Sequence, residues 1–202
     1  MLRLLGTLPQ GEVSVALSGG VDSVVAAYFL SKTRKVTCYH FNHQTPNAPR
    51  FQKFVEDFCS KHSLPLIVGT VVEEKKAEQS WEEYWRIQRY AFLKQSKNPV
   101  VTGHNLDDQV ETWIWACAHG QPRLMPYSRD NIIRPFLLCS KAELTEFAKR
   151  KELDWIEDPS NEDTAYMRNF IRHELTPKFK VVNPGIEKVL IKKMVSSLKG
   201  EK

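Results

Sequence analysis

The sequence lacks the marks of several protein classes. Its 202 residues include only four cysteines, Cys38, Cys59, Cys117 and Cys139, and no Cys-x-x-Cys pair. This spacing argues against a zinc cluster or a dithiol redox site, and we expect buried, reduced thiols. The longest apolar run, at about residues 24–30, is far shorter than the roughly 20 residues of a membrane-spanning helix. The first residues also lack the apolar stretch of a secretory signal, so we expect a soluble, cytoplasmic protein with no membrane partner.

Two familiar nucleotide-binding signatures are missing as well. The nine glycines form neither Gly-x-x-x-x-Gly-Lys-Ser/Thr nor Gly-x-Gly-x-x-Gly, which excludes the usual P-loop and the dinucleotide fingerprint. Hydrophobic residues make up 42% of the chain and charged residues 26%. These fractions are ordinary for a globular protein and exclude a wholly disordered chain. The length favours one domain with an appendage.

Positive charge gathers at one end of the chain. The formal net charge is +5, and residues 173–202 hold seven lysines against three glutamates. A basic end can bind a polyanion such as nucleic acid, or it can be the solvated face of a helix. Charge alone favours the solvated face.

Strand-like and helical segments alternate along the chain. Short apolar runs predict strands at 13–17, 35–41, 66–72, 99–102 and 132–133. Helical spacing, caps and turn signals predict helices at 24–30, 51–59, 80–95, 106–118, 140–151, 164–175 and 184–198, with Pro177 ending the sixth. This alternation predicts an α/β fold, a doubly wound and mostly parallel sheet with helices on both faces. A short helical C-terminal appendage follows it.

A glycine turn follows the first predicted strand. The sequence Ser18-Gly-Gly-Val-Asp-Ser23 leads from that strand into a helix. Glycines allow close backbone approach, and the N–H groups at a helix start carry partial positive charge. Together with the hydroxyls of Ser18 and Ser23, they are suited to hold a phosphate group. The alternative is a tight turn in which Asp22 only caps the helix.

Three acidic residues crowd the start of the helix predicted at 106–118. Asp107 and Glu111 are four residues apart, so they can converge on one ligand, and Asp108 lies between them. Such crowding beside a phosphate site favours Mg²⁺ or a cationic substrate between the carboxylates. The alternative is a solvated helix start with Asn105 as its cap.

Other candidates are individually weaker. His43 and His104 follow strands and would lie near the glycine turn, where they can contact a bound ligand or serve only the structure. Arg134 precedes Pro135 and is therefore held extended, as a phosphate clamp would be. Four tryptophans could stack on a flipped base, although core packing is the default for them: Trp81, Trp85, Trp113 and Trp115.

Two further groups combine arginine with a helical pattern. Arg86 and Arg89 lie on an aromatic-rich helix, where amphipathic packing is the default explanation. Arg168 and Arg172 share one helix face and, with Asn169, are suited to hold a phosphate group.

The glycine turn resembles the pyrophosphate loop of the N-type ATP pyrophosphatases, which transfer AMP from ATP to an oxygen and release pyrophosphate. The resemblance implies an adenine nucleotide alpha hydrolase-like fold, with a PP-loop catalytic domain at residues 1–176 and a basic helical appendage at 177–202. It also implies ATP and Mg²⁺ as cofactors.

An ordered set of further motifs resembles tRNA(Ile)-lysidine synthetase over about residues 13–172. They are His40-Phe-Asn-His43, Glu82 with Arg86, Arg89 and Tyr90, the stretch 103–112, Arg134-Pro135, Asp158-Pro-Ser-Asn161, and Arg168-Asn169 with Arg172. That family ligates lysine to C2 of the wobble cytidine of tRNA(Ile) with a CAU anticodon, through an adenylated intermediate, and releases AMP and pyrophosphate. The resemblance therefore implies an ATP-dependent ligase with tRNA(Ile) and free L-lysine as partners. A homodimer is a further expectation.

The resemblance also implies a role for each motif residue. ATP would be bound by Ser18, Gly19, Gly20, Val21, Asp22, Ser23, His43 and His104. The catalytic residues would be Asp22, Asp107, Asp108, Glu111 and Arg134. Of these, Asp22, Asp107 and Asp108 would hold Mg²⁺. Substrate or tRNA would be contacted by Arg86, Arg89, Arg168, Asn169 and Arg172.

The chain departs from the family pattern at three places. Residues 44–47 read Gln-Thr-Pro-Asn where the family has Gly-Leu-Arg, only Gly120 remains of a glycine-rich stretch, and about 30 residues follow Arg172. We therefore expect a short form that lacks the usual C-terminal domains, in which lysines of residues 178–202 contact the tRNA instead.

Two other functions stay open. One is a PP-loop enzyme that adenylates another tRNA base or nucleobase, for example for thiolation, although thiolating relatives commonly show paired cysteines and this sequence has none. The other is a nucleotide- or RNA-binding module without catalytic activity.

Overall fold

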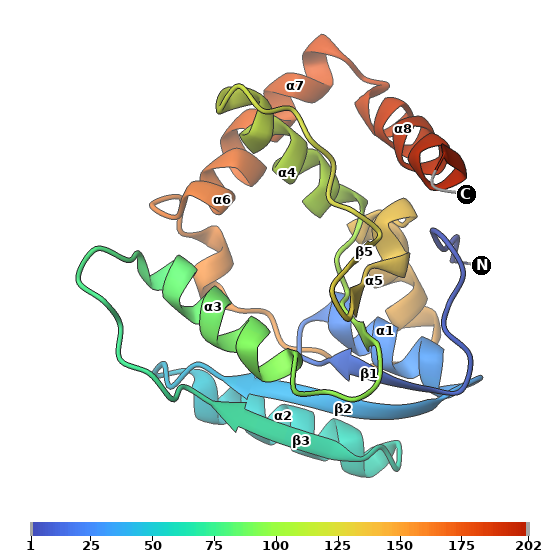
Figure 1. Ribbon diagram of the computed structural model, residues 1–202, viewed down its shortest axis with the longest axis vertical. Coiled ribbons are helices and arrows are strands. Elements are labelled where there is room, and N and C mark those ends of the chain that lie inside the picture. The colour runs from blue at the N-terminus through green and yellow to red at the C-terminus, as the bar shows by residue number, and fades with distance from the viewer. Residues whose placement is uncertain (1, 201–202) are drawn as a thin grey trace.

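The alternating segments fold around one sheet in the computed structural model, which describes residues 2–200 (Figure 1). The strands are β1 (Glu12–Ala16), β2 (Lys35–Asn42), β3 (Leu66–Thr70), β4 (Val100–Val101), β5 (Ser128–Arg129) and β6 (Ile132–Ile133). The helices are α1 (Val21–Ser31), α2 (Ala48–Lys61), α3 (Trp81–Leu93), α4 (Leu106–Ala118), α5 (Lys141–Arg150), α6 (Met167–Phe170), α7 (Thr176–Val182) and α8 (Ile186–Gly200). Between them lie the 3-10 turns η1 (Pro135–Leu138) and η2 (Pro159–Glu162) and the π-helical turn η3 (Ile171–Leu175).

The sheet is doubly wound. Its strand order is β3-β2-β1-β4-β6-β5, with β5 antiparallel to β6 and every other described pair parallel. The chain moves outward from β1 to β3 and then returns to the other side of β1 as β4. The predicted fold class is thereby confirmed. The carboxyl ends of β1 and β4 meet where the winding reverses, which is the usual ligand position in such sheets.

The two faces of the sheet pack against different helices. Val13 and Val15 of β1 lie in the largest core cluster with residues of α1, α2 and α5. Ala16 and Tyr39 point to the other face and pack with Leu93 of α3. Figure 1 accordingly shows α2 and α3 on opposite sides of β2. Successive residues of a strand point to opposite faces of the sheet. Because helices cover both faces here, neighbouring strand residues are both apolar, and the strands appear in the sequence as continuous apolar runs.

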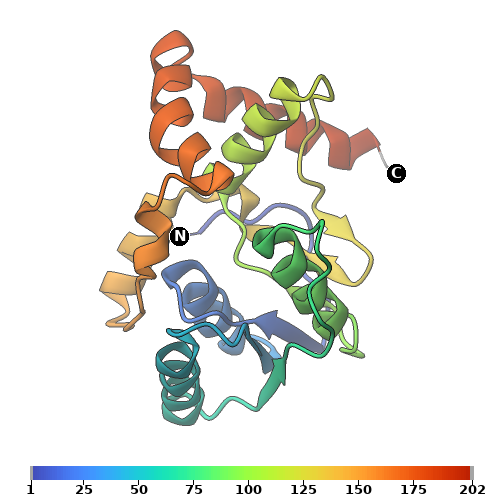
Figure 2. The same cartoon turned by 90° about the vertical axis from the view of Figure 1, so that its left-hand side faces the viewer.

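A second layer, made of helices only, lies beyond β4. Val110 and Ile114 of α4 are buried against Ile186 and Leu190 of α8. Figures 1 and 2 show α4, α7 and α8 together at one end of the molecule, away from β3. The segment predicted as an appendage is therefore packed onto α4 through α8. Its last two residues, 201 and 202, lie outside the described part of the chain.

The prediction that Pro177 ends a helix is wrong. The helical backbone runs from α6 through η3 into α7, and Pro177 occupies the first turn of α7. Proline lacks an N–H and clashes with the carbonyl four residues earlier in an α-helix. The wider π turn that precedes it changes the hydrogen-bond spacing at this point, so the helix continues.

Two other local expectations also fail. No strand is expected between the helix at 106–118 and the strand at 132–133, yet β5 lies there. Its two polar residues form a hairpin with β6 through Asp130, which is in the left-handed region at φ 55°. No apolar alternation marks such a short strand. Helix α1 begins three residues earlier than predicted, at Val21, because Gly20 is its N-cap.

The cysteines are free thiols. Cys38, Cys59 and Cys139 are buried, as predicted, and Cys117 is partly exposed. Every helix within residues 2–200 is too short or too polar to cross a membrane.

Candidate functional site

A cavity of about 480 Å³ opens at the carboxyl edge of the sheet. It lies at the reversal of winding between β1 and β4, where the fold favours ligand binding. Its lining includes most of the residues singled out in the sequence: Ser18, Gly20, Asp22, Ser23, His43, Arg89, His104, Asp108, Asp158, Asn161, Arg168, Asn169 and Arg172. The motifs that lie far apart in the chain therefore meet at one place.

The glycine turn, residues 18–23, forms one wall of this cavity. Gly19 has a φ of +95°, and a Cβ there would lie 3.3 Å from the ring of Phe54. Ser23 Oγ accepts a bond of 3.1 Å from the Ser18 N–H and donates one of 2.9 Å to the Gly20 carbonyl. Gly20 caps α1 without a side-chain bond. The first N–H groups of α1 thus have no capping side chain, which is the geometry of an anion site.

Gly103 allows the end of β4 to pack directly on the glycine turn. A Cβ at Gly103 would lie 2.8 Å from the carbonyl carbon of Asp22 and 2.9 Å from the nitrogen of Ser23. Both are backbone atoms, so any larger residue would displace the turn. This close approach brings the following residues, His104 and Asp108, beside the turn.

Lys141, the first residue of α5, contacts two of the acidic candidate residues, Asp22 and Asp107. Its Nζ lies 2.7 Å from Asp22 Oδ2, and its backbone N–H donates to Asp107 Oδ2 over 2.7 Å. The other oxygen of Asp22, Oδ1, is buried and has no hydrogen-bond partner among the described residues. Burial raises the pKa of Asp22 above its ordinary value, although Lys141 draws it back down. Asp22 therefore has a carboxylate oxygen available for a ligand.

Two acidic residues of α4 bind two arginines from α6 and η3. Arg168 lies 2.6 Å from Asp108 and 2.9 Å from Glu111, and Arg172 lies 2.7 Å from Glu111. Burial on its own would raise the pKa of Asp108, but Arg168, His104 and Arg172 hold it below its usual value. Burial likewise opposes the charge of Arg168, whose pKa is nevertheless raised by Asp108 and Glu111. The four charges compensate one another.

The structure does not bring Asp107 and Glu111 onto one partner, as their spacing suggested. Asp107 accepts the N–H of Lys141, whereas Glu111 shares the arginines with Asp108, three residues away. The four-residue spacing does place both residues on one helix face. However, α5 starts beside Asp107, and its first N–H group is hydrogen-bonded to the Asp107 carboxylate. The expected cap is present, since Asn105 and Asp108 form a reciprocal capping box.

The acidic residues fit Mg²⁺ only together with a phosphate. No group of three His, Cys, Asp or Glu side chains in residues 2–200 is arranged to hold a metal ion. Protein-bound Mg²⁺ commonly takes one or two carboxylates and completes its shell with phosphate oxygens and water. Asp22 fits this pattern through its free Oδ1, whereas Asp107 and Asp108 already have protein partners.

Neutral histidines line the cavity on the β2 and β4 side. Burial, with Arg89 and His40, lowers the pKa of His43 to about 4, and its buried Nδ1 has no partner in the described structure. Burial lowers the pKa of His104 to about 3, and its Nδ1 lies 2.7 Å from the Thr102 hydroxyl. Both imidazoles are uncharged at neutral pH and can exchange hydrogen bonds with a neutral base.

Of the three other candidate arginines, Arg86, Arg89 and Arg134, one lines the cavity. Arg89 lines the cavity, whereas Arg86 is exposed, with its guanidinium 4.8 Å from the ring centre of Tyr90. Arg134 is 3% exposed and donates to the Pro126 carbonyl over 3.1 Å. It is not among the residues that line the cavity, so its role as a phosphate clamp stays a prediction.

Asn169 and the tryptophans have packing roles in the structure. The Asn169 amide donates to the carbonyls of Ser160 and Asp163, over 2.8 and 2.9 Å, and so fixes the loop that carries Asp158 and Asn161. Each of the four candidate tryptophans packs on another ring, and the cavity lining in the described chain holds none of them. The partners are Trp81 on Trp85, Trp85 on His43, Trp113 on Phe179 and Trp115 on His119.

Sequence reasoning gave no role to several polar lining residues, among them Lys141 and Tyr90. Lys141 falls within the predicted helix at 140–151, in the capping box that starts with Ser140, and it follows the last parallel strand, where ligand contacts cluster. Tyr90 belongs to the motif with Glu82, Arg86 and Arg89 but received no predicted contact; it lines the cavity, and its buried hydroxyl has no partner among the described groups.

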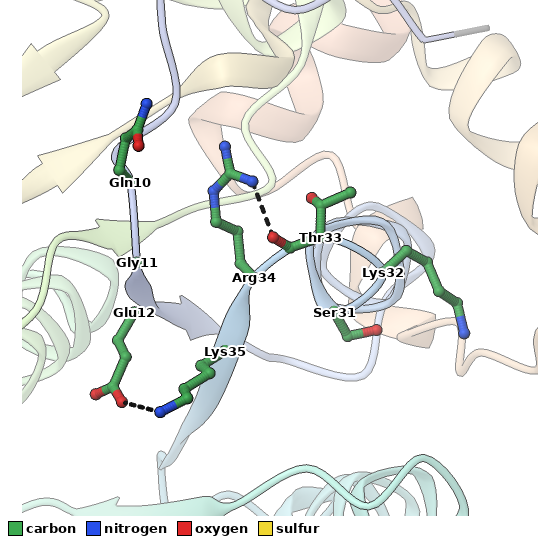
Figure 3. A pocket seen from close by; sticks show the side chains of 8 residues that line it. All are labelled: Gln10, Gly11, Glu12, Ser31, Lys32, Thr33, Arg34 and Lys35. Carbon is green, nitrogen blue, oxygen red and sulfur yellow. Dashed lines mark hydrogen bonds and ion pairs between the residues drawn. The ribbon is translucent and has the colours of Figure 1, made fainter.

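A second, open pocket of about 760 Å³ lies at the opposite, amino edge of the sheet (Figure 3). Residues 10–12 and 31–35 line it, and the side chains of Glu12 and Lys35 form an ion pair there. The amino edge of a parallel sheet is not where such folds bind ligands. The cavity at the glycine turn is therefore the candidate site.

Comparison with known sequences identifies relatives of most of the chain. The model of the PP-loop domain family matches residues 1–179. The tRNA(Ile)-lysidine synthase of Persephonella marina is 34% identical over 199 residues, covering 89% of this chain and 44% of that protein. The enzyme of the same name from Thermotoga maritima is 32% identical, covering 89% of this chain and 48% of that protein. The chain thus spans about half the length of these relatives.

Two solved structures share the fold. The U34-tRNA thiolase NcsA from Methanococcus maripaludis, with its [4Fe-4S] cluster, superposes with a TM-score of 0.74 at 16% identity, covering 96% of this chain and 75% of that one. The NH3-dependent NAD synthetase from Campylobacter jejuni superposes with a TM-score of 0.54 at 17% identity, covering 97% and 88%. At such identities the likeness concerns the fold alone.

Proposed function

The chain belongs to the PP-loop domain family, and on this premise we propose that it is an ATP-dependent ligase that modifies tRNA. The proposed substrates are free L-lysine and tRNA(Ile) with a CAU anticodon, in which lysine is joined to C2 of the wobble cytidine. The observation that carries the proposal is the glycine turn, open toward a cavity that also holds Asp22, His104, Asp108 and Arg168. The identity to curated tRNA(Ile)-lysidine synthases, at 32–34%, supports the choice of substrates.

In the proposed reaction, the O2 atom of the cytosine attacks the α-phosphate of ATP, and pyrophosphate leaves. The backbone N–H groups at the start of α1 stabilise the negative charge that develops on the leaving pyrophosphate. The ε-amine of lysine then attacks C2, and AMP leaves. Mg²⁺ at Asp22 would supply charge neutralisation for the phosphates. The uncharged His43 and His104 are suited to hydrogen bonds with the base or ribose of ATP.

The acidic pair on α4 is the proposed contact for the amine of lysine. Asp108 and Glu111 are neutralised by Arg168 and Arg172 in the structure. Binding of the lysine ammonium therefore requires an exchange of partners, in which an arginine turns outward. Both arginine side chains are more than one third exposed, at 36% and 37%, so they can reach an RNA phosphate at the cavity mouth.

The C-terminal lysines are proposed as further contacts with tRNA. Lys188, Lys192 and Lys193 are exposed on α8, whereas Ile186 and Leu190 are buried on its other side. Removing this helix would uncover α4, so charge reversal is a cleaner test than truncation. Replacing the three lysines by glutamate should weaken tRNA binding and leave ATP binding unchanged.

The test of the proposed function is incubation with labelled lysine, Mg-ATP and a tRNA(Ile) transcript that has a CAU anticodon. We expect label in the RNA, with one pyrophosphate and one AMP released per lysine joined. A transcript whose wobble cytidine is replaced by uridine should remain unlabelled. The Asp22→Asn variant serves as the inactive enzyme control.

The outcome also separates the alternatives. Pyrophosphate release that depends on RNA but not on lysine would favour an adenylating enzyme with another acceptor, such as a thiolase. Binding of ATP without release of pyrophosphate on any tRNA would favour a binding module. A homodimer stays a prediction, which the molar mass in solution will test.

A further inference from the structure

Lys141 is a charged side chain at the cavity to which the proposed reaction gives no role. Its side chain is half exposed, and its ammonium nitrogen lies 2.7 Å from Asp22 Oδ2. Its backbone N–H is bonded to Asp107, and Ser140 and Glu143 form a capping box around the helix start. The side chain therefore extends into the cavity from a fixed backbone.

Packing shows that the ammonium group is not needed to hold α5. Leu144 and Ala148 of α5 are fully buried in the main core, together with residues of α1 such as Ala27. A half-exposed ion pair contributes little beside that apolar contact. The Lys141 ammonium is therefore not required for the packing of α5 and is available to bind a ligand.

The cations around the cavity differ in how they are held. Arg168 and Arg172 share both Asp108 and Glu111, whereas Lys141 has one carboxylate, that of Asp22. The other oxygen of that carboxylate is the buried one that has no partner in the described structure. The contact between Lys141 and Asp22 is therefore the least completely bonded ion pair in the cavity.

The glycine turn provides no cation of its own. Residues 18–23 contain neither lysine nor arginine, although a triphosphate brings several negative charges to this wall. In P-loops a lysine inside the loop reaches the β- and γ-phosphates. A compact ammonium on a flexible stem can follow a phosphate in the same way, even when it comes from a different element.

We propose that Lys141 is a phosphate ligand of the ATP site, and that its ammonium moves from Asp22 to the pyrophosphate part of the nucleotide. In the free protein Lys141 holds Asp22, and in the complex Asp22 is released to face Mg²⁺. This inference rests on the ATP site of the proposed function, but not on tRNA or lysine as substrates.

The experiment compares the binding of ATP and of adenosine by titration calorimetry, with and without Mg²⁺. Lys141→Met keeps the stem and removes the charge. We expect it to weaken ATP binding by about tenfold to a hundredfold, the range of a charge-assisted bond, and to leave adenosine binding unchanged. Lys141→Arg should recover part of the ATP affinity. Lys35→Met, which removes the paired lysine at the amino edge, should bind both like the wild type.

Each outcome decides the inference. Equal ATP affinity of Lys141→Met and wild type overturns it, and so does an equal loss for ATP and adenosine, because that means a general change of the cavity. If the wild type binds ATP as expected but transfers no lysine, the proposed function fails and the role of Lys141 stands. If the wild type binds no ATP, both fail.

Discussion

The two edges of the sheet carry the same kind of ion pair in different surroundings. At the amino edge, Lys35 lies 3.3 Å from Glu12, and the two side chains are 84% and 56% exposed (Figure 3). At the carboxyl edge, Lys141 lies 2.7 Å from Asp22, and the two side chains are 50% and 25% exposed. Water satisfies and screens the first pair, whereas burial leaves an oxygen of the second without a partner. Two ion pairs of one type thus differ in how completely their oxygens are bonded, because they differ in burial.

The glycines at the two edges differ in the same way. Gly11 lies in the amino-edge pocket with a φ of +82°, and an added Cβ would have nothing within 4 Å. Gly103 at the carboxyl edge would place a Cβ 2.8 Å from the backbone of Asp22. One glycine serves only the local turn, and the other sets the position of the glycine turn.

The largest expected effect is the loss of turnover in Asp22→Asn. Pyrophosphate release should fall by about a thousandfold, or about 4 kcal/mol in the barrier, since the variant loses the only carboxylate with a free buried oxygen in the described cavity. Glu12→Gln at the amino edge is the matched control and should keep full turnover. The measurement is pyrophosphate release at saturating substrates.

The same variant should remain folded. The pKa of Asp22 is raised in the folded protein, chiefly by burial, so its ionised form opposes folding at neutral pH and this penalty is relieved as the pH falls. Replacing the carboxylate by an amide removes that penalty. A clear fall in melting temperature for Asp22→Asn would contradict this account.

The second prediction concerns the four charges on the acidic pair of α4. Glu111→Gln should lower the free energy of unfolding by about 3 kcal/mol, because Arg168 and Arg172 lose the more buried of the two carboxylates that they share. Urea denaturation measures the change. Glu146→Gln, which removes a weak exposed pair with Arg150 at 3.9 Å, is the control and should be nearly neutral. Equal effects of the two variants would show that Glu111 and its two arginines contribute no more to stability than an exposed ion pair does.

The third prediction compares the two glycines directly. Gly103→Ala should weaken ATP binding by about tenfold, because the new Cβ must displace the backbone of Asp22 and Ser23. Gly11→Ala should lower stability by about 1 kcal/mol through its positive φ and leave ATP binding unchanged. Calorimetric titration and thermal unfolding separate the two effects. Reduced ATP affinity in Gly11→Ala would remove the distinction between the edges.

The sequence predicted the fold class well because the strong signals are local. The strand before Ser18 and the helix at 106–118 have clear apolar patterns and caps, and the structure contains both elements. The two-residue strand β5 and the helix across Pro177 have no such signal, since a hairpin partner and a π turn decide them.

The candidate site was predictable as a set of residues but not as a set of partners. Spacing within α4 suggested that Asp107 and Glu111 act together, and Lys141 was not considered for the site. Both misjudgements have one cause, because the start of α5 lies beside Asp107 only in the folded chain. Contacts between residues 34 positions apart leave no trace in a local pattern.

The fourth prediction is a pH dependence that differs between the edges. In the proposed reaction Asp22 acts as an ionised carboxylate, and burial raises the pKa of this carboxyl. Pyrophosphate release should therefore be lost on acidification above the usual aspartate range. Lys141 lowers the pKa of Asp22, and Lys141→Met should therefore move the acid limb to still higher pH. Lys35→Met should leave the limb in place. The pH profile of pyrophosphate release measures both variants.

The smallest expected effect is at the exposed pair itself. Glu12→Gln and Lys35→Met should each change the free energy of unfolding by less than about 1 kcal/mol, since both side chains are mostly in water. High salt should abolish even this difference, because the screening length falls to a few ångströms. The Lys141→Met variant should keep its weaker ATP binding relative to wild type under the same salt, since a phosphate contact inside a cavity is screened less. If high salt also removed the difference in ATP binding between Lys141→Met and wild type, burial would not be what separates the two ion pairs. Phosphate binding in the cavity would then depend on the glycine turn alone.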